Sequence, residues 1–89
     1  MVIKFFAFIR DYTGAKETTM VVCPDLRELL EKLCSRYGTK LRVRLFTGDR
    51  LSDDIIILVN GRHINHLEGL DTKLEESDQI SIFPRVAGG

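Results

Sequence analysis

Residues 23–38, "CPDLRELLEKLCSRYG", carry the clearest local structural signal in the chain. Apolar side chains recur at the spacing of one helical face: Leu26, Leu29, Leu30, Leu33, Cys34 and Tyr37. Asp25 stands at the expected N-cap, and Glu28 follows it at capping-box spacing. Gly38 can adopt the left-handed conformation that ends a helix. The segment therefore predicts an amphipathic helix whose apolar face must be buried against another element.

The chain before this helix is predicted to form a β-hairpin. "VIKFFAFIR" (Val2–Arg10) is rich in Ile and Phe and is too short for a typical helix, which favours a strand. The stretch "YTGAKE" supplies the turn, and the β-branched residues of Thr18–Cys23 form the partner strand. Alternation along an extended first strand separates two faces, Ile3, Phe5, Ala7 and Ile9 on one and Lys4, Phe6, Phe8 and Arg10 on the other.

A second hairpin is predicted after the helix. Ile55–Val59 is a continuous apolar run that ends in Asn60 and Gly61, which tolerate positive φ in a type I′ turn. A short return strand, Arg62–Ile64, should follow. Residues 67–78 are predicted to be rich in turns, with a single helical turn among them.

The connection at residues 39–54 fits two alternatives. Leu41, Val43 and Leu45 alternate with basic residues, as they would in a strand. Leu41, Leu45 and Phe46 also suit a helical turn. The residues alone leave the type of this element open.

The last strand is Gln79–Pro84, with its side chains divided between two faces, Ile80 and Ile82 on one and Ser81 and Phe83 on the other. Pro84 has no N–H to donate, so sheet pairing is expected to stop there. The predicted order is β-β-α-β-β-β. One helix covers only one face of a sheet, which makes the fold α+β. We expect a domain at residues 1–83 and a flexible functional tail at residues 84–89.

Composition excludes several classes of protein. Hydrophobic residues make up 44% and charged residues 29%, as in globular domains. Thirteen Lys and Arg balance thirteen Asp and Glu, so the basic excess typical of nucleic-acid binding is missing. No apolar run approaches the roughly 20 residues that span a bilayer, and no secretory signal is evident. We expect a cytosolic protein without a nucleic-acid or membrane partner, in which Cys23 and Cys34 are small buried hydrophobes.

The chain ends in "SIFPRVAGG", and this end can take part in a covalent reaction. Gly88 and Gly89 lack a Cβ, so their backbone can pass through a slot that would exclude other residues. ATP can activate the terminal carboxylate as an acyl-adenylate, from which a thiol, persulfide or amine displaces AMP. Residues 84–89 span about 20 Å when extended, and ordering them costs roughly 6–12 kcal/mol. A docked tail therefore needs an apolar contact from the domain, for which Phe6, Phe8 and Phe83 are the candidates.

Other polar residues form no catalytic constellation. His63 and His66 follow the Asn-Gly turn without a third ligand nearby, so we predict surface histidines and no metal site. The acidic pairs at residues 53–54 and 75–76 lack an accompanying nucleophile or base. The local cluster of Arg42, Arg44 and Arg50 is predicted to be a solvated loop.

Three segments, "FFAFIRDYTG", "ILVNGRHINHLEGLDTKL" and above all "QISIFPRVAGG", resemble the ubiquitin-like β-grasp sulfur carriers (MoaD- and ThiS-like proteins). The closest resemblance is to the small subunit of molybdopterin synthase, including its archaeal-type relatives. It covers nearly the whole chain and is weakest at residues 39–54. The resemblance implies a β-grasp fold in which a mixed sheet of four to five strands packs on one main helix.

The resemblance also implies a reaction sequence. An activating enzyme of the ubiquitin-activating type, which uses ATP and magnesium, adenylates the last glycine, and a terminal thiocarboxylate is then formed. In molybdopterin synthase, two small subunits insert their tails into a dimer of the large catalytic subunit and supply sulfur to cyclic pyranopterin monophosphate. The chain itself would bind no cofactor and would be a non-catalytic subunit.

Carried over to this sequence, Gly89 would bear the sulfur and Gly88 would share its slot. The inserted tail would comprise Pro84, Arg85, Val86 and Ala87. Arg85 departs from the Phe-Pro-Pro pattern of many relatives, which makes the tail less stiff and adds a charge.

Two alternatives stay open from the sequence. The chain can be a sulfur carrier of another pathway, such as thiazole or tungsten-enzyme biosynthesis. It can also be a protein modifier joined to lysines, or a non-covalent adaptor with an idle tail.

Overall fold

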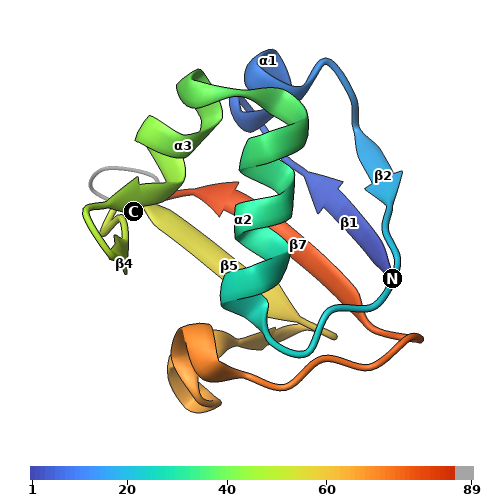
Figure 1. Cartoon of the computed structure of the whole chain (residues 1–89). Helices are drawn as coiled ribbons and strands as arrows, with labels where there is room; N and C mark the ends of the chain where they lie inside the picture. Colours follow the sequence, from blue (N-terminus) through green and yellow to red (C-terminus); the bar gives the residue numbers. More distant parts are fainter. Residues whose placement is uncertain (86–89) are drawn as a thin grey trace.

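The computed structural model describes residues 1–85, which form a five-stranded mixed sheet with the order β2-β1-β7-β5-β6. Its strands are β1 (Val2–Phe5), β2 (Glu17–Thr19), β5 (Ile55–Val59), β6 (Arg62–His63) and β7 (Gln79–Pro84). The β1–β7 pair is parallel, and the other pairs are antiparallel. Figure 1 shows α2 (Leu26–Tyr37) lying across one face of this sheet. The predicted α+β class and the mixed sheet on one main helix are confirmed.

The boundaries of α2 match the sequence prediction. The Asp25 side chain accepts a hydrogen bond of 2.9 Å from the Glu28 N–H, which satisfies one of the free donors at the start of the helix. At the other end, the Gly38 N–H donates to the Cys34 carbonyl at 2.8 Å, and Gly38 has a φ of 99°. A positive φ of this kind favours glycine, so both ends of α2 are fixed by local chemistry.

The hydrophobic core lies between α2 and the facing side of the sheet. The helix contributes Leu26, Leu29, Leu30, Leu33 and Cys34. The sheet contributes Ile3, Phe5, Ile55, Ile57, Val59, Ile80 and Ile82. Cys23 and Cys34 are both buried and free, as predicted. Burial raises the pKa of the Cys34 thiol.

The first strand is shorter than predicted, and the reason lies at the far end of the chain. β1 ends at Phe5, and α1 (Ile9–Thr13) replaces the second half of the predicted strand. The Phe6 N–H still donates to the Ile82 carbonyl at 3.1 Å, as in a parallel ladder. The next bond of that ladder would need an N–H on Pro84, which has none. The Phe6 carbonyl instead accepts from the Ile9 N–H at 3.2 Å.

Several other boundaries of strands and helices differ from the sequence prediction. β2 spans three residues, whereas Thr18–Cys23 was predicted. Met20 still exchanges two hydrogen bonds with Met1, and residues 21–23 then lead to α2. Residues 39–54, whose type was left open, contain the helix α3 (Thr39–Leu45) and a two-stranded hairpin. That hairpin pairs β3 (Phe46–Thr47) with β4 (Arg50–Leu51). Leu41 and Leu45 of α3 are buried one helical turn apart, so core packing selects the helical alternative.

The Asn60-Gly61 turn forms as predicted. Asn60 and Gly61 have φ values of 52° and 83°, and Val59 pairs with Arg62 across the turn. The return strand β6 is one residue shorter than predicted. Beyond it lie two 3₁₀ turns, η1 (Ile64–His66) and η2 (Gly69–Asp71), where one helical turn was predicted.

The Asn60 side chain ties this turn to the start of β7. Its Nδ2 donates to Asp78 Oδ1 at 2.8 Å, and its Oδ1 accepts from the Gln79 N–H at 2.9 Å. The other carboxylate oxygen of Asp78 accepts from the Glu75 N–H at 2.8 Å. These bonds fix the beginning of the strand that leads to the carboxyl terminus.

Candidate functional site

The strand that leads to the chain end is held in the middle of the sheet. β7 pairs with β1 on one side and β5 on the other. On the β1 side pairing stops before Pro84, as predicted. On the β5 side Pro84 lies opposite Ile55, and the Arg85 N–H donates to the Asp54 carbonyl at 2.7 Å. Two residues assigned to the tail are thus attached to the sheet.

The remaining tail residues, Val86, Ala87, Gly88 and Gly89, lie outside the described part of the chain. The predicted roles of Gly89 as the sulfur-bearing residue and Gly88 as its slot partner stay predictions.

Two of the predicted docking residues stack beside the end of β7. The rings of Phe6 and Phe83 lie 4.2 Å apart between centroids, with an angle of 10° between their planes. Both are half-buried on the sheet face opposite α2, which we call the open face. The guanidinium of Arg10 lies 5.8 Å from the Phe6 ring centroid, and its Nε donates to the Phe5 carbonyl at 2.9 Å. The partner-binding role of Phe6 and Phe83 stays a prediction.

The open face contains two further apolar residues that were not predicted from the sequence. Ile56 and Leu58 are half-buried and alternate with the core residues of β5. Ile56 lies opposite Phe83 in the ladder, and Leu58 lies opposite Ser81. The five-residue apolar run of β5 contained this signal, because alternate residues of a strand must point to opposite faces.

The third predicted docking residue, Phe8, lies apart from this stack. The break after Phe6, with a positive φ of 52° at Ala7, ends the alternation that placed Phe6 and Phe8 on one face. Phe8 is 42% exposed and instead meets Tyr12 edge-on, with 6.4 Å between ring centroids. The guanidinium carbon of Arg44 lies 5.5 Å from each of these rings. We call Phe8, Tyr12 and Arg44 the α1–α3 cluster.

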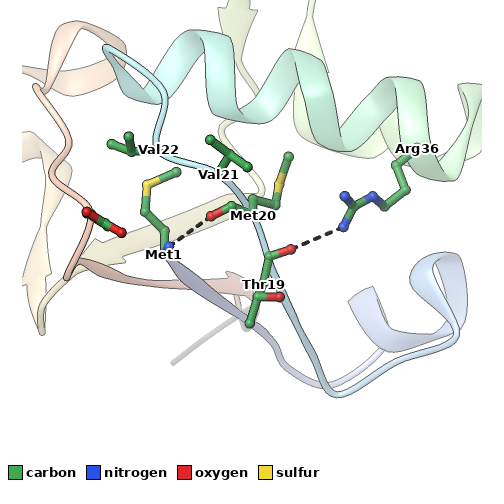
Figure 2. A pocket seen from close by; sticks show the side chains of 7 residues that line it. Met1, Thr19, Met20, Val21, Val22 and Arg36 are labelled. Atoms are coloured by element: carbon green, nitrogen blue, oxygen red, sulfur yellow. Dashed lines mark hydrogen bonds between the residues drawn. The ribbon is translucent and has the colours of Figure 1, made fainter.

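A groove follows the edge strand β2, away from the end of β7 (Figure 2). It is lined by Met1, Thr19, Met20, Val21, Val22, Arg36 and Glu76. The Arg36 guanidinium donates to Thr18 Oγ1 at 3.0 Å and to the Thr19 carbonyl at 3.4 Å. An edge strand presents unpaired backbone groups, and Arg36 occupies one of them. The lining contains no nucleophile beside a base.

The remaining charged candidates are at the surface. Arg42 forms a bidentate pair with Glu31, and this hydrogen bonding lowers the pKa of the Glu31 carboxyl group. The pair is half-exposed, so its contribution to stability is small. His63 Nδ1 accepts from the Asn65 N–H at 3.0 Å, and the His63 and His66 rings are 6.3 Å apart.

The described residues contain neither a metal-binding cluster nor a membrane-spanning helix. Within residues 1–85, no group of three or more His, Cys, Asp or Glu side chains is placed to hold a metal ion. In that same part of the chain, no helix has the length and apolar character needed to cross a membrane.

Comparison with known proteins agrees with this architecture. The model of the ThiS family matches residues 3–89. Small archaeal modifier protein 3 of Haloferax volcanii is 35% identical over 89 residues, covering 98% of this chain and 96% of that protein. A putative sulfur carrier protein of Archaeoglobus fulgidus is 39% identical over 64 residues, 72% of this chain and 73% of that protein. A chain of the Amycolatopsis orientalis BexX/CysO complex is 25% identical with a TM-score of 0.87, covering 99% and 98% of the two chains.

A mixed five-stranded sheet on one main helix, in a chain whose sequence has Gly-Gly after the central strand, defines a ubiquitin-like β-grasp protein. The chain belongs to the ThiS family, within the β-grasp sulfur carriers and small archaeal modifiers. As a member of this family, the chain is a sulfur carrier or small modifier. One of the similar solved chains belongs to a complex, that of BexX with CysO.

Proposed function

We propose that this protein carries sulfur on its carboxyl terminus as a thiocarboxylate of Gly89. Its end is inserted into a partner while the open face of the sheet contacts that partner outside. The observation that carries this proposal is the position of the end of β7. This central strand reaches Pro84 beside the Phe6–Phe83 stack, and Gly88 and Gly89 follow shortly after it in the sequence.

The chemistry begins with activation, because a carboxylate is a poor electrophile. The terminal oxygen attacks the α-phosphorus of ATP, which forms an acyl-adenylate and releases pyrophosphate. A sulfur nucleophile, a persulfide or sulfide, then attacks the acyl carbon and expels AMP. With a persulfide, the product is an acyl disulfide, and a thiol then attacks the donor's sulfur, which releases the thiocarboxylate and forms a disulfide with the donor. With sulfide, the thiocarboxylate forms directly. ATP and magnesium belong to the activating enzyme, in keeping with the predicted cytosolic location.

The geometry supports a carrier that is gripped from outside. Phe6, Phe83, Ile56 and Leu58 place apolar surface on the open face next to the point where the chain leaves the sheet. Apolar and aromatic surface of this kind supplies most of the binding free energy at protein interfaces. That free energy can offset the roughly 1–2 kcal/mol per residue lost when the tail is ordered.

The identity of the sulfur acceptor is a finer proposal. The sequence resemblance favours cyclic pyranopterin monophosphate, held by the large subunit of molybdopterin synthase in a heterotetramer. Thiazole formation or another sulfur-requiring pathway fits the same tail chemistry. Co-purification of the native partner separates these possibilities, since a pterin-binding large subunit is expected only for the first.

A second candidate function is protein modification. It is favoured by the 35% identity to a small archaeal modifier protein over nearly the whole chain. A lysine amine can displace AMP from the same acyl-adenylate and form an isopeptide bond to Gly89. Peptides carrying a remnant that ends in Gly89 on lysines of other proteins would establish this route.

The carrier function is tested by intact mass. The full chain is incubated with its activating enzyme, ATP, magnesium and a sulfur donor. We expect a mass gain equal to the exchange of one oxygen for sulfur, and none in a variant without Gly88 and Gly89. No gain in the full chain, with the enzyme shown active on another carrier, would overturn the proposal.

A further inference from the structure

The α1–α3 cluster lies at the end of the molecule from which the tail leaves. Figure 1 shows α1 and α3 beside the end of β7, beyond the carboxyl end of α2. Hydrogen bonds connect this region to the root of the tail. The Ser52 N–H donates to the Leu45 carbonyl at 2.8 Å, and two residues later Asp54 accepts from the Arg85 N–H. A partner that receives the tail therefore approaches the cluster as well.

The cluster presents a guanidinium in a fixed orientation. Arg44 Nε donates to the Tyr12 hydroxyl at 2.8 Å, and the guanidinium carbon is 5.5 Å from the ring centroids of both Phe8 and Tyr12. These contacts use one of the five N–H groups of Arg44 and leave the terminal amino groups for another acceptor. An arginine stacked on aromatic rings loses little conformational entropy on binding a carboxylate, which it can hold with two hydrogen bonds.

Two cations of α3 belong to this surface, although the chain as a whole is neutral: Lys40 lies one helical turn before Arg44. Arg10 of α1 packs over Phe6 on the open face. Among residues 1–85, none of these three cations has a carboxylate within 4.0 Å. The acid of α1, Asp11, forms no ion pair there either. Apolar surface adjoins the charge, since Phe8 is 42% and Val43 68% exposed.

We propose that the α1–α3 cluster is a second contact for the enzyme that adenylates the tail, and that it binds a carboxylate-bearing, partly apolar surface of that enzyme. This inference rests on the proposed function, because it requires activation of the chain end. The activating enzyme is the partner that fits best, since both the carrier and the modifier route must pass through the acyl-adenylate. Opposite charge on the enzyme complements Arg44 and Lys40, and Phe8 supplies the apolar part.

The test measures KM and kcat for adenylation of the full chain by the activating enzyme. The rate is monitored by ATP–pyrophosphate exchange. We expect Arg44→Glu to raise the KM for the chain about tenfold or more, the effect of losing one strong interface contact, with little change in kcat. Phe8→Ala should raise KM as well. Added salt should raise the KM of the wild type more than that of Arg44→Glu, because screening acts on the charge contact.

Lys73→Glu is the matched control, since it makes the same charge change near the other end of α2, where the backbone of Lys73 pairs with that of Asp25 in an isolated β-bridge. An equal rise in KM for Lys73→Glu would show that KM depends on the net charge of the chain and not on the α1–α3 cluster, and would overturn the proposal. Unfolding measured by circular dichroism checks the fold of each variant. Arg44→Gln, which removes the charge without reversing it, replaces Arg44→Glu if the latter unfolds.

These measurements distinguish a failure of the α1–α3 contact from a failure of the carrier function. If the wild type is adenylated and Arg44→Glu, Arg44→Gln and Phe8→Ala keep its KM within about twofold, the cluster is not a contact and the carrier function stands. If the wild type is not adenylated by an enzyme active on another carrier, the proposed function and this inference fall together.

Discussion

Asn60 offers a direct test of how the fold positions the tail. Its side chain is the link between the β5–β6 turn and the start of β7, with two hydrogen bonds of 2.8 and 2.9 Å. One of them goes to the Asp78 carboxylate, which is only 8% exposed. Two substitutions, Asn60→Gly and Asn60→Ala, remove the same side-chain hydrogen bonds but differ in the backbone conformation that they tolerate.

Asn60 affects stability in two ways, through the hydrogen bonds of its side chain and through the backbone strain at a positive φ. A hydrogen bond to a charged group contributes about 1.5 kcal/mol and a neutral one about 0.5–1 kcal/mol, so the side chain is expected to stabilise by about 2 kcal/mol. At a φ of 52°, glycine is unstrained, whereas alanine costs a further 1–2 kcal/mol or so. We therefore expect a loss of about 2 kcal/mol for Asn60→Gly and about 3–4 kcal/mol for Asn60→Ala.

The assay is equilibrium unfolding in urea, with the slope of the transition compared between variants. For a domain of this size, 2 kcal/mol corresponds to a fall in Tm of about 10 °C. An Asn60→Gly variant within about 0.5 kcal/mol of the wild type would show that these bonds contribute no net stability. Equal losses for Gly and Ala would refute the assigned backbone strain.

Three further predictions concern the surface. Phe6→Ala and Phe83→Ala should each weaken binding to the activating enzyme by about tenfold in calorimetry, whereas Val21→Ala, an exposed apolar truncation at the far edge, should not. Arg36→Ala uncovers the β2 edge, so sedimentation should detect more self-association than in the wild type; an unchanged profile would contradict this protective role. Glu31 has a lowered pKa in the fold, so its stabilisation is present above the unfolded-state pKa and is lost as pH falls through the folded-state value. The difference in unfolding free energy between wild type and Glu31→Gln should therefore shrink on acidification, and a difference that grows would refute the sign.

The elements that sequence predicted best have all their determinants close together. α2 carries its N-cap at Asp25, its apolar stripe and its terminal Gly38 within one contiguous segment. The β5–β6 turn needs only Asn60 and Gly61 in the left-handed region. Patterns of this kind are visible without knowledge of the rest of the fold.

The failures come from contacts between distant residues. The end of β1 depends on Pro84, which lies far along the chain and withholds the N–H that the Phe6 carbonyl would need. Because α1 begins just after this break, Phe8 joins Tyr12 and Arg44 and not the Phe6–Phe83 stack. An apolar residue of a strand and one of a short helix look alike in sequence, so the two aromatic groups could not be separated.

The candidate site was predictable only in part for a related reason. Sequence identified Phe6 and Phe83 because aromatic residues stand out, and the structure brings them together. Ile56 and Leu58 were not identified, since their run of five apolar residues also contains three core positions. Register with β7 is what assigns them to the open face.

The position of the open face also limits how a partner can bind. From the sequence, residues 84–89 offered a reach of about 20 Å, but the Arg85 N–H is bonded to Asp54 in the structure. While that bond holds, only residues 86–89 can extend, which is at most about 14 Å. An enzyme that receives Gly89 must then press against the surface around Pro84, where Phe83 and Ile56 lie opposite one another. A short reach therefore requires an apolar surface next to Pro84, because Gly89 can enter a buried active site only if the partner also contacts the domain there.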